Sequence, residues 1–136
     1  MRKLKRQQQH LPRPTDTELS ILRVLWEHGP GSVRETLKRF NRGQEAEAGY
    51  TTILKMLQIM TDKGLVERDD SQRPQVYRAR LPQEQTQRQL LDDLLDKAFG
   101  GSAKDLVMQA LASKEASEEE LAQVERLLDK LEGGSK

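Results

Sequence analysis

Four hydrogen-bonding side chains recur on one side of a helix that the sequence predicts near the middle of the chain. Apolar residues in the segment 49–63 follow the spacing of a single buried helical face, at Tyr50, Ile53, Leu57 and Met60. The polar residues that fall away from this face are Thr51, Thr52, Lys55 and Gln58. Hydroxyl, ammonium and amide groups can hydrogen-bond to base edges, and a threonine methyl can pack against a thymine methyl. The pattern therefore indicates a helix suited to the major groove of DNA.

Two of these assignments have plainer alternatives. Lys55 can be a solvated lysine on the surface of a helix, without any partner. One of Thr51 and Thr52 can cap the start of the helix instead of contacting DNA. The sequence leaves these alternatives open.

A two-stranded hairpin is predicted directly after this helix. Lys63-Gly64 ends the helix, because glycine readily adopts the left-handed conformation found at helix ends. Residues 65–67 and 76–78 are the predicted strands, and the polar stretch 69–74 is their turn. Three arginines in this hairpin are candidate contacts to the DNA backbone, which would position the protein without reading sequence: Arg68, Arg73 and Arg78. Their competing use is pairing with the neighbouring acids Glu67, Asp69 and Asp70.

Two further helices must precede this element to position it. Thr15 and Glu18 have the spacing of a capping box at the start of a helix over 15–28, which ends at Gly29-Pro30. Ser32 and Glu35 form a second capping box, which starts a short helix over 33–40. Three helices followed by a hairpin is the order of a winged helix-turn-helix, so the fold is predicted to be mainly α with a small β-hairpin over residues 15–82.

Residues 83–136 are predicted to be three amphipathic helices that cannot form a domain alone. Units of this size cover little apolar surface, and a second copy of the same surface would cover the rest. We therefore expect a C-terminal helical dimerisation region, whose candidate contact residues are Leu91, Leu94, Leu95, Leu106, Val107, Leu111, Leu121, Val124 and Leu128. The alternative is that these helices fold back on the winged domain.

The charge of the chain is divided between its two halves. Residues 1–82 hold 16 Lys and Arg against 10 Asp and Glu, whereas residues 83–136 hold 7 against 12. A basic half that contains the predicted recognition helix is the expected electrostatic footprint for phosphate binding. Residues 1–14 form a basic tail, which we expect to be disordered and which can contact the DNA backbone or only aid solubility.

Several classes of function have no residues to support them. The chain has no cysteine and two histidines, so we expect no metal site and no disulfide, and a reducing cytoplasm is the natural compartment. No phosphate-binding glycine loop and no nucleophile–base pair is present, so we expect no cofactor, no small-molecule ligand and no enzymatic activity. No apolar run has the ~20 residues of a membrane span, and the first residues do not have the pattern of a secretory signal.

Three stretches of the chain resemble the penicillinase-repressor family: PTDTELSILRVLWEHGPGSVRETL, AGYTTILKMLQIMTDKGLVERD and QVYRARLPQEQ. The resemblance extends from about Leu11 to Glu132 and includes GGSAKDLVMQAL near the C-terminus. It implies a homodimeric winged-helix repressor that binds an inverted-repeat DNA operator and dimerises through its C-terminal helices. It also implies that a membrane-bound metalloprotease sensor relieves repression by triggering cleavage in that C-terminal segment.

The sequence departs from the family at two places. Ile59 stands where an arginine is common in the family, which would remove a potential phosphate or base contact, so the operator preference of the family cannot be transferred. The scissile Asn–Phe bond of the family aligns with Gln109-Ala110, which we treat as the candidate cleavage site. The alternative is that Gln109 and Ala110 occupy an ordinary helical position that packs at the dimer interface.

These observations lead to one interpretation and one rival. The chain is expected to be a DNA-binding transcriptional repressor that acts as a homodimer on an inverted-repeat operator. The rival is a winged-helix module that binds protein instead of DNA and uses residues 83–136 for assembly. Salt dependence discriminates between them, because DNA binding releases counterions and weakens steeply as salt rises.

Overall fold

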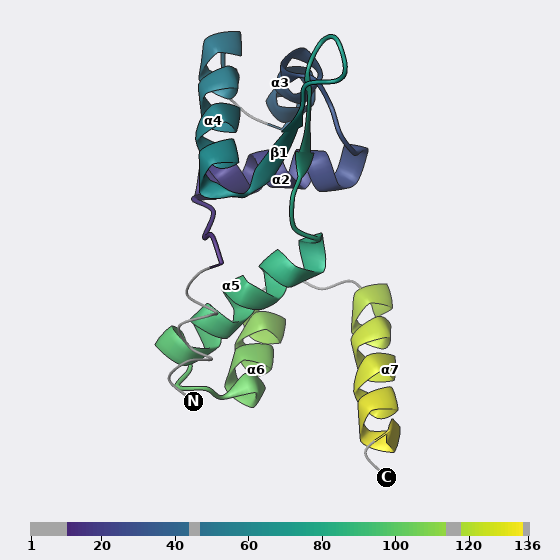
Figure 1. Ribbon diagram of the computed structural model, residues 1–136. Helices are drawn as coiled ribbons and strands as arrows, with labels where there is room; N and C mark the ends of the chain where they lie inside the picture. The colour runs from purple at the N-terminus through teal and green to yellow at the C-terminus, as the bar shows by residue number, and fades with distance from the viewer. Residues whose placement is uncertain (1–10, 44–46, 114–117, 135–136) are drawn as a thin grey trace. The chain divides into compact units, whose positions relative to one another are not determined.

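The computed structural model describes residues 11–43, 47–113 and 118–134 (Figure 1). The chain divides into two compact units, residues 1–91 and residues 92–136. The elements in chain order are α2 (Asp16–His28), α3 (Val33–Asn41), α4 (Tyr50–Lys63), β1 (Val66–Asp69), β2 (Val76–Ala79), α5 (Gln83–Ala98), α6 (Ala103–Ser113) and α7 (Glu118–Gly134). The predicted fold class is confirmed: the described residues are mainly helical and include a small antiparallel hairpin, in the order of a winged helix-turn-helix.

Both predicted capping boxes are present at the starts of α2 and α3. Thr15 Oγ1 accepts from the Glu18 backbone N–H at 3.3 Å, and Glu18 Oε1 accepts from the Thr15 N–H at 2.9 Å. Ser32 and Glu35 make the same reciprocal pair at 3.1 and 2.9 Å. Each box satisfies two backbone donors that a helix end leaves unpaired, so both helices begin where the sequence predicts.

The core of the first unit lies between the three helices and the hairpin. α3 packs against both α2 and α4, β1 packs against α4, and β2 packs against α2 (Figure 1). The buried apolar side chains are Ile21, Leu22, Leu25, Val33, Phe40, Ile53, Leu57, Met60, Leu65, Val66 and Tyr77. This arrangement leaves one face of α4 outside the core.

The hairpin is joined to the helices by backbone hydrogen bonds as well as by packing. Its two strands pair antiparallel, with Arg68 opposite Tyr77 and Asp69 opposite Val76. Tyr77 also pairs with Gly31, each backbone N–H donating to the other residue's carbonyl at 2.8 and 3.0 Å. The segment before α3 thus extends the sheet by one bridge and fixes the hairpin beside α3. We use the name wing for β1, β2 and their connecting loop 70–75.

The structure corrects two details of the prediction and rules out one alternative. Tyr50, expected on the buried face of α4, is 45% exposed because it lies at the very first turn, beyond the end of the core. Gly49 is the N-cap of α4 and makes no side-chain cap bond, so neither Thr51 nor Thr52 caps the helix. Leu65 lies before β1 and is buried, whereas Asp69, expected in the turn, belongs to the strand.

Three helices are present after the hairpin, as predicted: α5, α6 and α7. α5 ends at Gly100 and Gly101, whose φ angles are +55° and +86°, and the Gly101 N–H donates to the Leu95 carbonyl at 2.8 Å. Ser102 Oγ then accepts from the Asp105 N–H at 3.1 Å at the start of α6. Ser117 and Glu120 have the spacing of a capping box in the sequence and would start the last helix, but Ser117 lies outside the described residues. No helix among the residues described is long and apolar enough to span a bilayer.

Candidate nucleic-acid interface

The recognition-helix candidate α4 is fixed in place by its buried face and by its C-terminal end. Ile53, Leu57 and Met60 are at most 1% exposed. Gly64 adopts the left-handed conformation (φ 82°) that ends the helix, and its N–H donates back to the carbonyls of the last turn. Arg80 Nε donates to the Gly64 carbonyl at 2.6 Å, which ties this end of α4 to the residue after β2.

An ion pair adds a link from α4 to α2 that the sequence analysis missed. Lys63 Nζ lies 2.6 Å from Glu18 Oε1, and the Glu18 side chain is only 4% exposed. Burial by itself would raise the pKa of Glu18. The hydrogen bond from Lys63, the hydrogen bond from the Thr15 N–H and the charge of the lysine outweigh this effect, so the pKa of Glu18 lies below its ordinary value of 4.5. The capping carboxylate of α2 therefore also anchors the last turn of α4.

The outward face of α4 carries the predicted DNA-contact residues together. Thr51, Thr52, Lys55 and Gln58 are all exposed. At 100° per residue they fall within roughly one third of the helix circumference, opposite the buried face. Within the ranges that the structure describes, none of their side chains is bonded to another protein group. Exposed Ile59 and Asp62 lie on this same face.

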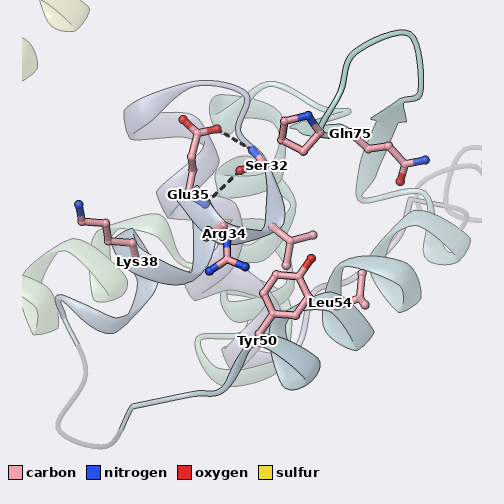
Figure 2. A pocket seen from close by; sticks show the side chains of 9 residues that line it. Ser32, Arg34, Glu35, Lys38, Tyr50, Leu54 and Gln75 are labelled. Atoms are coloured by element: carbon pink, nitrogen blue, oxygen red, sulfur yellow. Dashed lines mark hydrogen bonds between the residues drawn. The ribbon is translucent and has the colours of Figure 1, made fainter.

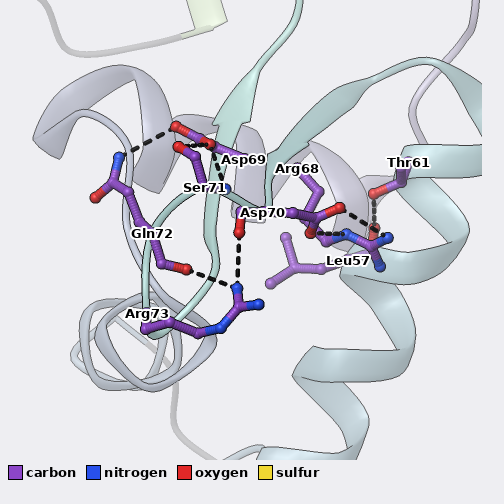
Figure 3. Close-up of polar contacts among 8 residues, drawn as sticks. All are labelled: Leu57, Thr61, Arg68, Asp69, Asp70, Ser71, Gln72 and Arg73. Atoms are coloured by element: carbon purple, nitrogen blue, oxygen red, sulfur yellow. Dashed lines mark hydrogen bonds and ion pairs between the residues drawn. The ribbon is translucent and has the colours of Figure 1, made fainter.

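The wing arginines already have partners within the protein. Figure 3 shows Arg68, whose Nε lies 2.7 Å from Asp70 Oδ1. Arg78 Nη2 lies 3.5 Å from Asp69 Oδ2. Arg73 Nη1 donates to the Asp70 carbonyl at 2.7 Å. The competing use of these arginines is therefore realised for Arg68 and Arg78 in the protein without DNA. Because the pairs are exposed, a phosphate can replace the carboxylate at little cost.

Asp69 organises the loop of the wing. Its Oδ1 accepts from both the Ser71 hydroxyl, at 2.5 Å, and the Ser71 N–H, at 2.9 Å, while Gln72 Nε2 donates to its Oδ2 at 3.2 Å (Figure 3). These hydrogen bonds, chiefly those from Ser71, lower the pKa of Asp69. Asp69 therefore stays ionised and holds the turn, whereas Asp70 serves mainly as the partner of Arg68.

Removal of the Asp70 charge should increase binding to DNA of any sequence. Asp70→Asn frees the Arg68 guanidinium, so we expect affinity for a random duplex to rise by about 2- to 5-fold at low salt, the scale of an exposed ion pair. Fluorescence anisotropy with a labelled duplex measures this. Glu27→Gln makes the same charge change on the exposed surface of α2 and should have a smaller effect. Equal effects of the two variants would mean that net charge alone is responsible.

A groove opens between α3, the first turns of α4 and the loop of the wing (Figure 2). Its volume is about 750 Å³, and its lining residues are Ser32, Val33, Arg34, Glu35, Lys38, Tyr50, Leu54, Pro74 and Gln75. The Arg34 guanidinium lies 5.5 Å from the centre of the Tyr50 ring, within the range of a cation–π contact. Arg34 and Lys38 could not be recognised from the sequence, because their grouping with Tyr50 and the wing depends on tertiary packing.

The candidate dimerisation residues include an unusual share of exposed apolar side chains. Leu91, Leu94, Val107, Leu111 and Leu121 are each 38–46% exposed. Leu95, Leu106 and Val124 are half-buried, and the side chain of Leu128 lies outside the described part of the structure. Gln109 and Ala110, the candidate cleavage site, are both exposed on α6.

The order of elements, the hairpin joined to the helices by the Gly31–Tyr77 bridge and the polar outward face of α4 define a winged helix-turn-helix protein of the DNA-binding class. The sequence model of the family described as "Penicillinase repressor" matches residues 14–130. The penicillinase repressor of Bacillus licheniformis is 22% identical over 119 residues, which cover 88% of this chain and 91% of that protein. The chain belongs to the penicillinase repressor family, and it is a DNA-binding transcriptional repressor and not an enzyme.

Proposed function

We propose that the protein represses transcription as a homodimer on an inverted-repeat operator, with one α4 helix in the major groove of each half-site. The observation that supports this most is the outward face of α4, where Thr51, Thr52, Lys55 and Gln58 are exposed on a helix whose opposite face is anchored in the core. Side chains that are free of protein partners can hydrogen-bond to base edges without first losing other contacts.

The residues of the interface divide by role. Lys55 suits guanine O6 and N7, Gln58 suits adenine, and the threonines can bond to bases or phosphates. Arg68, Arg73 and Arg78 would bind the backbone beside the major groove and so set the register of α4. Since the two copies of α4 belong to one twofold dimer, the half-site centres should be separated by about one helical turn of DNA, roughly 34–36 Å, or by a multiple of it.

Homodimerisation is supported by the apolar side chains that α5, α6 and α7 leave exposed. An identical second surface is the simplest partner for a homo-oligomeric repressor, and a twofold dimer matches an inverted-repeat operator. Residues 83–136 are in this proposal the dimerisation region and residues 15–82 the DNA-binding domain.

Relief of repression would follow from proteolysis within α6. Gln109-Ala110 is exposed on α6, and a cut there would separate the end of α6 and all of α7 from the rest of the chain. A membrane metalloprotease sensor would supply the signal. Incubation of the repressor with membranes from induced cells, followed by mass spectrometry, identifies any cut; an intact chain under conditions that relieve repression would reject this step.

Binding to the upstream region of the chain's own gene tests the DNA-reading role. We expect a protected inverted repeat, and an affinity that falls by about 10³-fold or more between 50 and 200 mM salt if six or more phosphates are contacted. Lys55→Ala should weaken operator binding by about 1–3 kcal/mol and leave random DNA less affected, if Lys55 reads a base. Equal losses on both duplexes would make it a phosphate contact. Absence of protection together with an affinity insensitive to salt would favour the protein-binding rival.

A further inference from the structure

The groove beside α4 is not used by any contact proposed above. Its lining combines apolar surface from Val33, Leu54 and Pro74 with the cations Arg34 and Lys38. We propose that this groove holds one sugar-phosphate strand of the operator, with Arg34 and Lys38 on its phosphates. This inference rests on DNA binding through α4 and names a second part of the same interface.

The position of the groove follows the geometry of a duplex. A single sugar-phosphate strand separates the major groove from the adjacent minor groove. When α4 lies in the major groove and the wing lies beyond its edge, that strand must pass between them. The groove lies in this place, because Tyr50 and Leu54 of α4 line one part of it and Pro74 and Gln75 of the wing loop line another (Figure 2).

The charges in the groove suit a phosphate chain. Arg34 and Lys38 are one turn apart on α3 and therefore on the same side of that helix. In the described ranges, no carboxylate pairs with either of them. Glu35 also lines the groove, but its carboxylate accepts the Ser32 N–H and lies 3.9 Å from Arg39 Nη2, so its charge is partly engaged there.

Tyr50 positions Arg34 in this arrangement. Its ring lies 5.5 Å from the guanidinium carbon, which restrains a long side chain that would otherwise sample many rotamers. An exposed aromatic ring also offers an apolar surface to the deoxyribose. This role makes use of the exposure of Tyr50 at the first turn of α4.

Arg34→Ala and Lys38→Ala test the groove by a salt series on the operator and on a random duplex. Each should lower affinity about tenfold on both duplexes and reduce the slope of log K against log salt by about 0.9. Tyr50→Ala should reproduce part of the Arg34 loss, and Tyr50→Phe should not. Arg23→Ala, which removes an exposed arginine of α2, is the matched control and should leave the slope unchanged.

Methylphosphonate substitution locates the contact. A neutral linkage at one or two positions should weaken wild-type binding and add nothing further to Arg34→Ala. Unchanged slopes for both variants, while the wild type still binds its operator, would overturn the groove proposal and leave the repressor function intact. Failure of the wild type to bind any duplex would instead reject the proposed function.

A second inference comes from Ile59, which is 41% exposed on the outward face of α4. It lies four residues after Lys55 and seven after Thr52, so the three share one side of the helix. The apolar group that base edges present in the major groove is the thymine 5-methyl. We infer that Ile59 reads a thymine through this methyl group.

Replacement of single operator thymines by deoxyuridine, which lacks the methyl, tests this directly. One position should lower wild-type affinity by about 3- to 10-fold and have no effect on Ile59→Ala. Asp62→Ala, which changes another exposed residue on the same face of α4, is the control and should lose affinity at the same deoxyuridine position as the wild type. If every deoxyuridine substitution lowers the affinity of the wild type and of Ile59→Ala equally, the inference fails. Operator binding by the wild type is not called into question by that result.

Discussion

Replacement of Leu94 and Leu111 by aspartate is expected to convert the repressor to a monomer and to weaken operator binding by about 10²- to 10⁴-fold. In a dimer, binding of one α4 to its half-site holds the second α4 close to the other half-site, so the second binding step has a high effective concentration. This advantage is lost when the two copies separate. Sedimentation velocity measures the assembly state, and anisotropy with the operator measures the affinity.

The chain itself does not bury either of these two side chains. Leu94 is 46% exposed and Leu111 is 38% exposed. A charge at an exposed position costs little in a monomer, but at the centre of a dimer interface it is buried without a partner. The winged domain should therefore keep its fold and its binding to random DNA, and only the cooperative operator binding should be lost.

Gln87→Asp with Gln123→Asp is the matched control, since it adds the same two charges at exposed positions of α5 and α7. This control should remain dimeric and bind the operator with at most a small loss from added negative charge. A monomeric wild type with tight operator binding would contradict the dimer proposal. A leucine variant that stays dimeric would place the interface elsewhere.

Local signals in the sequence predicted the fold well. The capping boxes at Thr15–Glu18 and Ser32–Glu35, and the glycine after α4, each depend on residues within one turn of each other. Their geometry is therefore determined by the local chain, and the predicted elements are confirmed within a few residues. The exposed face of α4 followed from the same local periodicity.

Contacts between distant residues could not be predicted in this way. Glu18 and Lys63 are 45 positions apart, and nothing in the capping box reveals that its glutamate also binds a lysine. The groove depends on α3, α4 and the wing loop meeting in space. Tyr50 was misplaced because helical periodicity describes only the direction of a side chain, whereas its burial depends on how far the neighbouring elements extend.

The Glu18–Lys63 pair leads to a prediction about stability. Lys63→Met should lower the free energy of unfolding at pH 7 by about 3 kcal/mol. This is the low end of the 3–5 kcal/mol for breaking a buried pair, because the lysine side chain is 35% exposed and partly screened by water. The variant leaves a buried carboxylate that retains the Thr15 N–H as its described hydrogen-bond partner.

The pH dependence separates this charge effect from lost packing. The pKa of Glu18 is lowered in the folded wild type, so its carboxylate stabilises the protein above pH 4.5, and this contribution is lost as pH falls through the folded pKa. Without Lys63, fewer interactions oppose the effect of burial on the Glu18 carboxyl, so its pKa rises. A protonated Glu18 needs no cation, so the difference between wild type and variant should shrink below about pH 4.5.

Urea unfolding at pH 7 and at pH 4 measures both effects. Glu18→Gln combined with Lys63→Met should recover much of the stability at pH 7, because no charge is then buried. Lys55→Met, at an exposed position of the same helix, should change stability by less than about 0.5 kcal/mol. A loss of equal size at both pH values would show that the lysine stem, and not its charge, holds the end of α4 on α2. α4 presents its outward side chains from this anchored position. Lys63→Met should therefore also weaken binding to the operator more than binding to a random duplex.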